Sequence, residues 1–455
     1  MTRPLRYILA SFSGAICVIL SSAASAQTDV SVAEAQRLAY GLLERGQYGA
    51  ALELVETLQQ DGRNQTAVAD IARSRALRGL NRPQEAVQVR RRAFRLANTP
   101  TEKFLGARSV AQAYSTGENR TMAQVWLRLA SQYAPDESAH ALNRRDFDYV
   151  RTRNPISLAF DLTVQPTDNI NNAPTDNTIT FLGIIFSDPT LFPISGTNIQ
   201  TETNLSYRLP ATATRFSELR ISHYGRRVIL GNEADAIDPD LTTSDLSQDR
   251  ISIAWGNNFR RADSNWVIDT TIAAYADWAA GAHIQNGLSV DVGYRLPVTQ
   301  GLSLRIGGGL DSAARLDNAL RSFDSWSAQI GWSGAFDGVG QLELAASFRD
   351  IRSESFAVAR EQWGLSEVYA LPIAVLTADL SIIARYGEAQ YDKPLFGPDP
   401  RFDQTFSGTL AASLPQAEVF GFIPVVEFTH EQVTSNVTRF ETDTTHIGFS
   451  IRSSF

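Results

Sequence analysis

The alternation of apolar and polar residues after Pro155 constrains the fold of this chain more than any other feature of its sequence. In 156–164, Ile, Leu, Phe, Leu and Val alternate with Ser, Ala, Asp and Thr, and the same period recurs in 288–296 and 342–349. Because successive side chains of a β-strand point to opposite faces, each segment predicts a strand with one apolar and one polar face. A barrel wall between lipid and water has this pattern, and so does a soluble β-sandwich.

The connections between the strands favour the barrel. We expect 14 strands, near 156–166, 197–209, 215–226, 248–260, 265–277, 286–296, 301–313, 323–335, 340–350, 361–371, 376–388, 402–414, 420–430 and 440–455. Long and short linkers alternate between them, and four short linkers follow a Leu-Pro step, at Pro210, Pro297, Pro372 and Pro415. Proline has no N–H to donate to a sheet and therefore marks a strand end. Short turns at one rim and long loops at the other predict a 14-stranded antiparallel outer-membrane β-barrel over 155–455.

The first 26 residues have the features of a secretory signal peptide. Arg3 and Arg6 precede an apolar stretch, and the small residues 24–26 follow it. We expect cleavage after Ala26 and export of the chain. The sole cysteine, Cys17, lies in the apolar stretch, so the mature chain is expected to have no disulfide and no lipid anchor. No later apolar run is long enough for a membrane-spanning helix.

The segment 27–154 has helical periodicity, with apolar residues recurring at intervals of three and four. Ala50, Ala86 and Ala123 stand at corresponding places in three turn-and-helix phrases, 36 and 37 residues apart. This spacing is close to the tetratricopeptide period of about 34 residues. It predicts a short TPR-like helical solenoid, with a concave face for a peptide or a protein partner. A plain helical bundle is the alternative.

The chain carries a net charge of −8, but the helical segment is basic, with 19 Arg and Lys against 14 Asp and Glu. Four arginines lie on one expected helix: Arg90, Arg91, Arg92 and Arg95. They form either a solvated face or a set of candidate contacts for a client protein or for acidic lipid headgroups.

Charged residues also occur in the polar register of the expected strands. They are Arg220, Asp291, Arg295, Arg305, Glu343, Arg349, Asp379, Arg385, Glu427 and Arg452. Their mixed signs predict ion pairs between strands that support the wall from the inside. Lining a passage or the seat of a plug is the alternative role.

No residues suggest catalysis or a cofactor. The five histidines, His140, His223, His283, His430 and His446, do not have zinc-ligand spacing. The pair Ser222-His223 lacks an identifiable orienting acid, and phosphate-loop, dinucleotide and nucleic-acid motifs are absent from the sequence. We therefore expect no enzyme, no cofactor, no metal and no nucleic-acid partner.

Aromatic residues fit a barrel in a bilayer. Trp255, Trp266, Trp278, Trp326, Trp332 and Trp363 are candidates for the two interfacial girdles. The last strand ends on Phe455, preceded in the same register by Ile451 and Phe449. We expect these three residues to be the signal read by the barrel-assembly machinery.

A TPR-like domain followed by a 14-stranded barrel resembles the surface lipoprotein assembly modifiers, called Slam. Four short segments are similar to that family: Asp168-Asn169-Ile170-Asn171-Asn172-Ala173, Gly421-Phe422-Ile423-Pro424, Thr434-Ser435-Asn436 and 447–455. The resemblance implies a translocator in the outer membrane, with the helical domain in the periplasm. It would move a lipoprotein or secreted protein client to the cell surface, in contact with the barrel-assembly machinery and outer-membrane lipids. A TPR-barrel polysaccharide exporter and a passive porin or ligand-binding barrel are the alternatives.

Overall fold

The computed structural model describes residues 31–60, 66–176, 178–181, 184–187, 191–261, 265–299, 301–394 and 399–453. The expected signal peptide 1–26, Cys17 and Phe455 lie outside these residues. The chain divides into two compact units, Met1–Leu96 and Ala97–Phe455. The expected boundary between a helical domain and a barrel, at 154/155, coincides with the change from helix to strand rather than with the boundary between these units.

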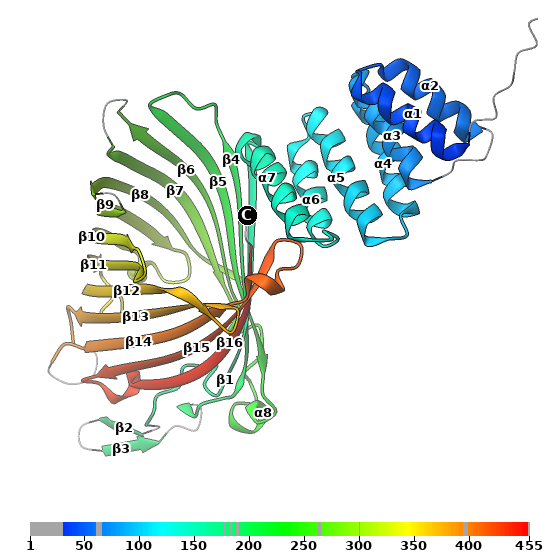
Figure 1. Ribbon diagram of the computed structural model, residues 1–455. Coiled ribbons are helices and arrows are strands. Elements are labelled where there is room, and N and C mark those ends of the chain that lie inside the picture. Colours follow the sequence, from blue (N-terminus) through cyan, green and yellow to red (C-terminus); the bar gives the residue numbers. More distant parts are fainter. Residues whose placement is uncertain are drawn as a thin grey trace, which may run out of the picture. The chain divides into compact units, whose positions relative to one another are not determined.

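Seven helices precede the first strand in the described part of the chain (Figure 1). They are α1 (Val32–Glu44), α2 (Tyr48–Gln60), α3 (Ala67–Gly79), α4 (Pro83–Leu96), α5 (Pro100–Thr116), α6 (Arg120–Ser131) and α7 (Glu137–Arg153). Capping boxes start α1 at Ser31 and α5 at Thr99, where Glu34 and Glu102 complete the reciprocal hydrogen bonds. The helices α1–α4 belong to the first unit, and α5–α7 belong to the second.

The same turn joins α1 to α2, α3 to α4 and α5 to α6. Its central residue has a left-handed backbone in each case: Gly46 (φ 72°), Asn81 (φ 59°) and Glu118 (φ 61°). The next N–H donates to the carbonyl five residues earlier, at 2.9, 2.9 and 3.0 Å. Three helical hairpins with one turn geometry therefore underlie the sequence repeat.

The repeated alanine of the first hairpin is Ala51 rather than the expected Ala50. Ala51, Ala86 and Ala123 are each 0% exposed. Ala50, the expected counterpart in the first hairpin, is exposed. Each of the three buried alanines donates its N–H to the residue that follows the left-handed turn, so these are the equivalent positions. A sequence repeat alone does not distinguish two adjacent alanines, whereas helix packing does.

The second unit contains a closed barrel of 14 antiparallel strands, as expected from the alternation (Figure 1). They are β1 (Ile156–Thr167), β4 (Gly196–Arg208), β5 (Arg215–Leu230), β6 (Gln248–Arg260), β7 (Val267–Ala279), β8 (Ala282–Thr299), β9 (Leu302–Arg315), β10 (Phe323–Phe336), β11 (Gly340–Ser353), β12 (Arg360–Val375), β13 (Ala378–Tyr391), β14 (Phe402–Ser413), β15 (Phe422–Ser435) and β16 (Thr442–Ser453). Each strand pairs with its neighbours in sequence, and β1 closes the wall against β16 from Asp161↔Arg452 to Val164↔Phe449.

We call the rim at which β1 begins the proximal rim and the opposite rim the distal rim. The longest connections, 168–195 and 231–247, lie at the distal rim. The first contains the hairpin β2 (Thr178–Phe181) and β3 (Ile184–Ser187), and the second contains α8 (Ala234–Ile237). One expected distal loop, Trp278 to Gln285, is instead a tight turn, because Ala280 (φ 50°) and Gly281 (φ 75°) both adopt the left-handed backbone that such hairpins need.

Two of the four Leu-Pro steps do not end a strand. Pro297 lies inside β8 and Pro372 lies inside β12. In both strands the register shifts beside the proline, between Pro297 and Thr299 and between Ala370 and Ala374. A bulge allows the strand to continue past a residue that cannot donate to the ladder.

Candidate functional site

The outer face of the barrel is apolar. Along β8, Leu288, Val290 and Val292 are 64%, 41% and 50% exposed and share one face. Their counterparts on the other strands include Leu219, Ile253, Ile272, Ile306, Leu310, Ile330, Leu365, Leu410, Phe428 and Ile447. A soluble sandwich would bury such a row, whereas in a bilayer the lipid chains cover it.

Aromatic side chains lie near both edges of this apolar face. Toward the distal rim, Phe348 contacts Trp326 and Trp363, with ring centroids 5.1 and 4.5 Å apart. The indole Nε1 of Trp326 donates to Asp350 at 3.0 Å, which gives the ring a polar end. Toward the proximal rim, Trp332 lies 5.9 Å from Phe336 and Trp266 lies 6.0 Å from Tyr294. Four of the six tryptophans expected in the interfacial girdles therefore lie near an edge, whereas Trp255 pairs with Ile272 in the middle of the apolar face.

The register places all ten charged residues expected in the polar register on the face opposite the apolar row. They are Arg220, Asp291, Arg295, Arg305, Glu343, Arg349, Asp379, Arg385, Glu427 and Arg452. Five of them take part in ion pairs: Arg220 with Glu218, Arg305 with Asp269, Arg349 with Asp311, and Arg452 with Glu427. The other five, Asp291, Arg295, Glu343, Asp379 and Arg385, are exposed on the inner face.

A polar network that the sequence analysis missed crosses β6 to β11 on the inner face. Asp311 accepts a hydrogen bond from the Tyr275 hydroxyl at 2.7 Å and another from Arg349 at 2.7 Å. Arg250 donates to both carboxylate oxygens of Asp277, at 2.6 and 2.8 Å, and stacks on the Tyr275 ring. All these residues stand in the polar register, so the sequence could have predicted that they face inward. Their partners could not be predicted, because they depend on the pairing of the strands.

Small side chains beside this network leave a hollow in the inner wall, with a volume of about 350 Å³. It is lined by Arg250, Ser252, Ala273, Tyr275, Ser289, Asp291, Gly309, Leu310, Asp311, Ser325, Ser327 and Arg349. At Gly309 a Cβ would lie 2.4 Å from Asp291 Oδ1, so only glycine lets that carboxylate lie against the wall. Hydroxyl groups and charges of both signs converge here, which suits a polar ligand or a hydrated path.

Ser222 and His223 do not form a catalytic pair. Ser222 faces inward and donates to Asn204 at 2.6 Å, whereas His223 faces outward and contacts Asp249 at 3.0 Å. Adjacent residues of a strand point to opposite faces, so their side chains cannot reach one another.

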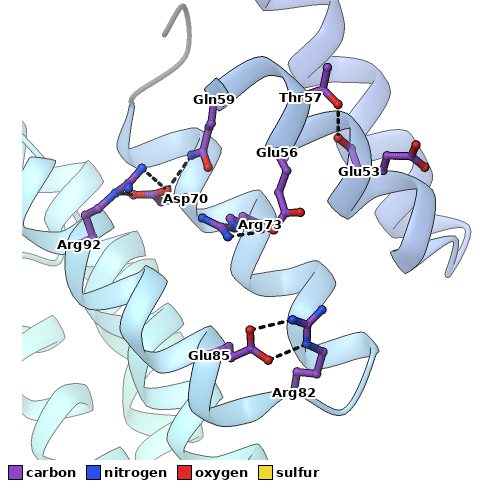
Figure 2. Close-up of polar contacts among 9 residues, drawn as sticks. All are labelled: Glu53, Glu56, Thr57, Gln59, Asp70, Arg73, Arg82, Glu85 and Arg92. Carbon is purple, nitrogen blue, oxygen red and sulfur yellow. Dashed lines mark hydrogen bonds and ion pairs between the residues drawn. The ribbon is translucent and has the colours of Figure 1, made fainter. Parts of the chain in front are cut away.

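The helical arginines do not share one surface. Arg91 and Arg95 are exposed, while Arg92 binds Asp70 on α3 at 2.8 Å (Figure 2). Arg90 is buried, with 1% of its surface exposed. Helical geometry explains the split, because consecutive residues are about 100° apart around the axis. Of the four candidate client contacts, only Arg91 and Arg95 are exposed at the surface, whereas Arg92 binds Asp70 and Arg90 is buried.

The Asn-rich segment after β1 shapes the distal loops. The amide of Asn169 both accepts from the Ala173 N–H at 2.7 Å and donates to its carbonyl at 2.8 Å. Asn171 donates to Phe192 and accepts from Ile194. These bonds hold Ile170 in a small buried cluster with Ile194, Val228 and Ala234.

The segment Thr434-Ser435-Asn436 has a similar role. Asn436 donates to the Pro400 carbonyl at 2.9 Å and accepts from the Phe402 N–H at 2.8 Å. Ser435 donates to Asp403 at 2.7 Å. The segment therefore ties the distal end of β15 to the start of β14.

A cleft of about 640 Å³ lies at the proximal rim within the second unit. Its lining comes from α6, α7 and the turn between β14 and β15, and includes Arg128, His140, Phe147, Gln416 and Glu418. Burial lowers the pKa of Arg128 to about 10, although nearby Glu418 opposes this shift. The cation lies over the Phe147 ring at 5.4 Å.

Among the described residues, none of the helices combines the length and the hydropathy needed to cross a membrane. The apolar outer face, the two aromatic belts and the polar inner face together define a transmembrane β-barrel of the outer-membrane type.

Comparison with known proteins finds likenesses among solved structures but none in sequence families. No protein-family model matches the sequence. No curated protein matches it either. The structure is similar to OmpTdeltaL8, a loop-deletion mutant of OmpT, an outer membrane protein of Vibrio cholerae, with 9% identity over 66% of this chain and 98% of that chain, at a TM-score of 0.36.

Two further structures show the same degree of likeness. A BenF-like porin from Pseudomonas fluorescens Pf-5 has 8% identity over 66% of this chain and 99% of its own, at a TM-score of 0.36. OccAB3 of Acinetobacter baumannii has 9% identity over 65% of this chain and 98% of its own, also at 0.36. Scores and identities this low transfer neither a substrate nor a mechanism.

Proposed function

We propose that this chain is an outer-membrane translocator that moves a lipoprotein or secreted protein client from the periplasm to the cell surface. One observation carries the proposal: three helical hairpins with a common turn precede a closed transmembrane barrel in a single chain. Tandem helical hairpins are built to hold a peptide or a protein partner. A barrel that only passes small solutes has no need of them.

In this proposal, the proximal rim faces the periplasm and the distal loops face outward. The even number of strands places both ends of the barrel sequence at the proximal rim, on the side of the short turns. The helical hairpins would hold the client, and the cleft beside α7 would lie on its way to the lumen. The resemblance to the Slam family in the segments at 168–173 and 434–436 supports the same role.

Export is tested in cells. Deleting the gene should remove at least one lipoprotein or secreted protein from the surface, as measured by protease shaving followed by mass spectrometry. The full chain should restore it, whereas a chain with residues 31–96 deleted should be inserted but should not restore it. An unchanged surface in the deletion strain would refute the proposal.

A passive porin is the second candidate, and the inner wall favours it. Charged side chains and the 350 Å³ hollow line that wall, as a hydrated path for small solutes requires. Purified full-length protein in planar bilayers distinguishes the two functions. A steady large conductance without a client favours the porin, and silence until a client is added favours the translocator.

A further inference from the structure

The hollow in the inner wall of the barrel is lined by charges that cancel. Two arginines and two aspartates contribute to it, Arg250 and Arg349 with Asp291 and Asp311. A site with an excess of one sign attracts ions of the opposite sign, whereas a balanced site gives neither an anion nor a cation an advantage. The charge balance of the hollow therefore favours an uncharged ligand.

Apolar side chains contribute little to this hollow. Its lining includes Leu310, but that side chain belongs to the outer apolar row. The remaining carbon surface comes from Ala273 and from the ring of Tyr275, and the guanidinium of Arg250 lies 4.6 Å from the centre of that ring. An apolar ligand would displace water from charges and hydroxyl groups and gain few apolar contacts in return. The hollow therefore suits a ligand that is polar over its whole surface.

The two arginines of the rim are held in place by the protein itself. Arg250 donates to both carboxylate oxygens of Asp277, at 2.6 and 2.8 Å. Arg349 donates to Asp311 at 2.7 Å and to Ser325 at 2.9 and 3.1 Å. These bonds use the Nε and Nη2 atoms of each arginine and leave Nη1 as a donor for a ligand. Donors that are already fixed bind a ligand at a lower entropic cost.

Other polar groups of the hollow form no hydrogen bond with the described residues. They are the carboxylate of Asp291 and the hydroxyl groups of Ser252, Ser289 and Ser327. In the sheet, Asp291 is paired with Gly309, and Gly309 is paired with Ser327. The ionised carboxylate only accepts hydrogen bonds, whereas each serine hydroxyl can donate and accept. A matching ligand must therefore offer several donors and acceptors close together.

Glycine at position 309 brings two of these groups to one place. A Cβ on Gly309 would lie 2.4 Å from Oδ1 of Asp291 and 3.1 Å from Oγ of Ser327. Both oxygens therefore lie beside the same backbone position, where they can bind neighbouring groups of a single ligand. The absence of a side chain at 309 also allows the carboxylate to lie against the wall and keeps the hollow open.

We propose that this hollow is a binding site for an uncharged sugar unit in the lumen of the barrel. Each hydroxyl group of a pyranose can donate and accept, so adjacent hydroxyls match Asp291 as the acceptor, the two arginines as donors and the serines as either. A volume of about 350 Å³ is sufficient for a sugar ring and some ordered water. The proposal goes beyond the translocator role and does not depend on it, because it requires only that the lumen contain water.

The binding test uses the full chain in a detergent without a sugar headgroup and a set of pyranoses of similar size: glucose, its acid glucuronate and its amine glucosamine. Titration followed by saturation-transfer NMR gives the dissociation constant for each. Glucose should bind, and both charged sugars should bind about tenfold more weakly or worse, because the balanced site does not replace the hydration that an ion loses. Equal or tighter binding of a charged sugar, or the absence of glucose binding, would overturn the proposal.

A pair of variants locates the sugar. Asp291→Ala should weaken glucose binding by about tenfold, because a hydrogen bond to a charged group is lost. Asp379→Ala is the matched control: it removes another exposed carboxylate of the inner face, on β13 and outside the hollow, and should bind glucose normally. The faster gel migration of unheated protein confirms that each variant is folded. Normal binding by Asp291→Ala, or an equal loss in Asp379→Ala, would rule out the hollow as the site.

A glycine variant tests the geometry without removing a polar group. In Gly309→Ala the new methyl group must displace the carboxylate of Asp291, so glucose binding should fall here too. Gly331→Ala adds a methyl group to the same face of β10, where its nearest neighbour would lie at an ordinary 3.6 Å, and should leave binding unchanged. Normal binding by folded Gly309→Ala would contradict the proposed site. None of these measurements needs a client or export, so their failure leaves the translocator proposal to its own test in cells.

Discussion

Arg92 holds the carboxylate of Asp70, whose side chain is fully buried, through two hydrogen bonds of 2.8 and 3.1 Å (Figure 2). The pair joins α4 to α3 inside the second hairpin. Arg92 itself is 39% exposed, so water screens part of the attraction, but it cannot reach the acid. The stability of this hairpin therefore depends on the cation.

We predict that Arg92→Ala lowers the free energy of unfolding of the helical region by about 2–3 kcal/mol, because it leaves Asp70 buried with only Gln59 as a partner. Chemical denaturation of the full chain in detergent, followed by circular dichroism of the helices, measures the change. The double variant Arg92→Ala with Asp70→Asn should recover part of the loss. Equal stability of Arg92→Ala and the natural protein would show that the pair contributes nothing.

The repeated turn gives a second prediction. Glu118 has φ 61° at the position that glycine occupies in the first hairpin, at Gly46. Glu118→Gly should stabilise the chain by about 0.5–1 kcal/mol, because the left-handed backbone strains a residue with a Cβ more than it strains glycine. Gly46→Ala should destabilise by about 1 kcal/mol for the same reason. Thermal unfolding of the two variants should therefore shift in opposite directions.

Some features of the helical hairpins and the barrel could be predicted from the sequence, and others could not. The turns were predictable in place, since a phrase repeats three times, and the strands were predictable because the alternation has a period of two. The burial of Arg90 could not be predicted, because neighbouring arginines on one helix differ in burial only once α3 is packed against that helix. The tight turn at Ala280 and Gly281 was missed because its two small residues resemble an ordinary loop.

For the lumen, the sequence predicted the face on which each side chain lies but not the residues that it contacts. The polar register placed Arg349 inward, but its pairing with Asp311 needs the order and stagger of β9, β10 and β11. Between strands, a shift of one residue moves a side chain to the other face, so partners cannot be assigned without the register.

The pair of Arg349 and Asp311 leads to the third prediction. Arg349→Ala should lower the stability of the folded barrel by about 1–2 kcal/mol, since Asp311 and Ser325 lose their cationic donor. Urea titration in lipid vesicles measures the effect. Arg385→Ala, which removes an exposed lumen charge, is the control and should change stability by less than about 0.5 kcal/mol. Equal losses in both variants would mean that charge, rather than the pair, determines the effect.

A distal loop gives a pH prediction. The hydrogen bond from Arg315 lowers the pKa of Asp317 to about 2, against an ordinary value of 3.8. A carboxylate with a depressed folded-state pKa stabilises the fold above its unfolded pKa, and this contribution is lost as the pH falls through the folded value. The difference in melting temperature between the natural protein and Asp317→Asn should therefore be constant above pH 5 and vanish between about pH 4 and 2. A difference that persists below that window would refute the assignment.

The last prediction tests the transmembrane wall itself, with two adjacent residues of β8. Val290 belongs to the apolar outer row and is 41% exposed, whereas Ser289 lines the hollow of the inner face beside Asp291. Val290→Arg should cost about 2–4 kcal/mol of folding free energy in a bilayer, because the charge enters hydrocarbon. Ser289→Arg adds the same side chain to a wet, polar surface beside Asp291 and should be tolerated. Folding into vesicles, read from the faster gel migration of unheated protein, should fail or slow for the first variant only. If both variants fold equally well, or if Ser289→Arg is the damaging change, the outer face does not contact lipid and the role in export cannot hold.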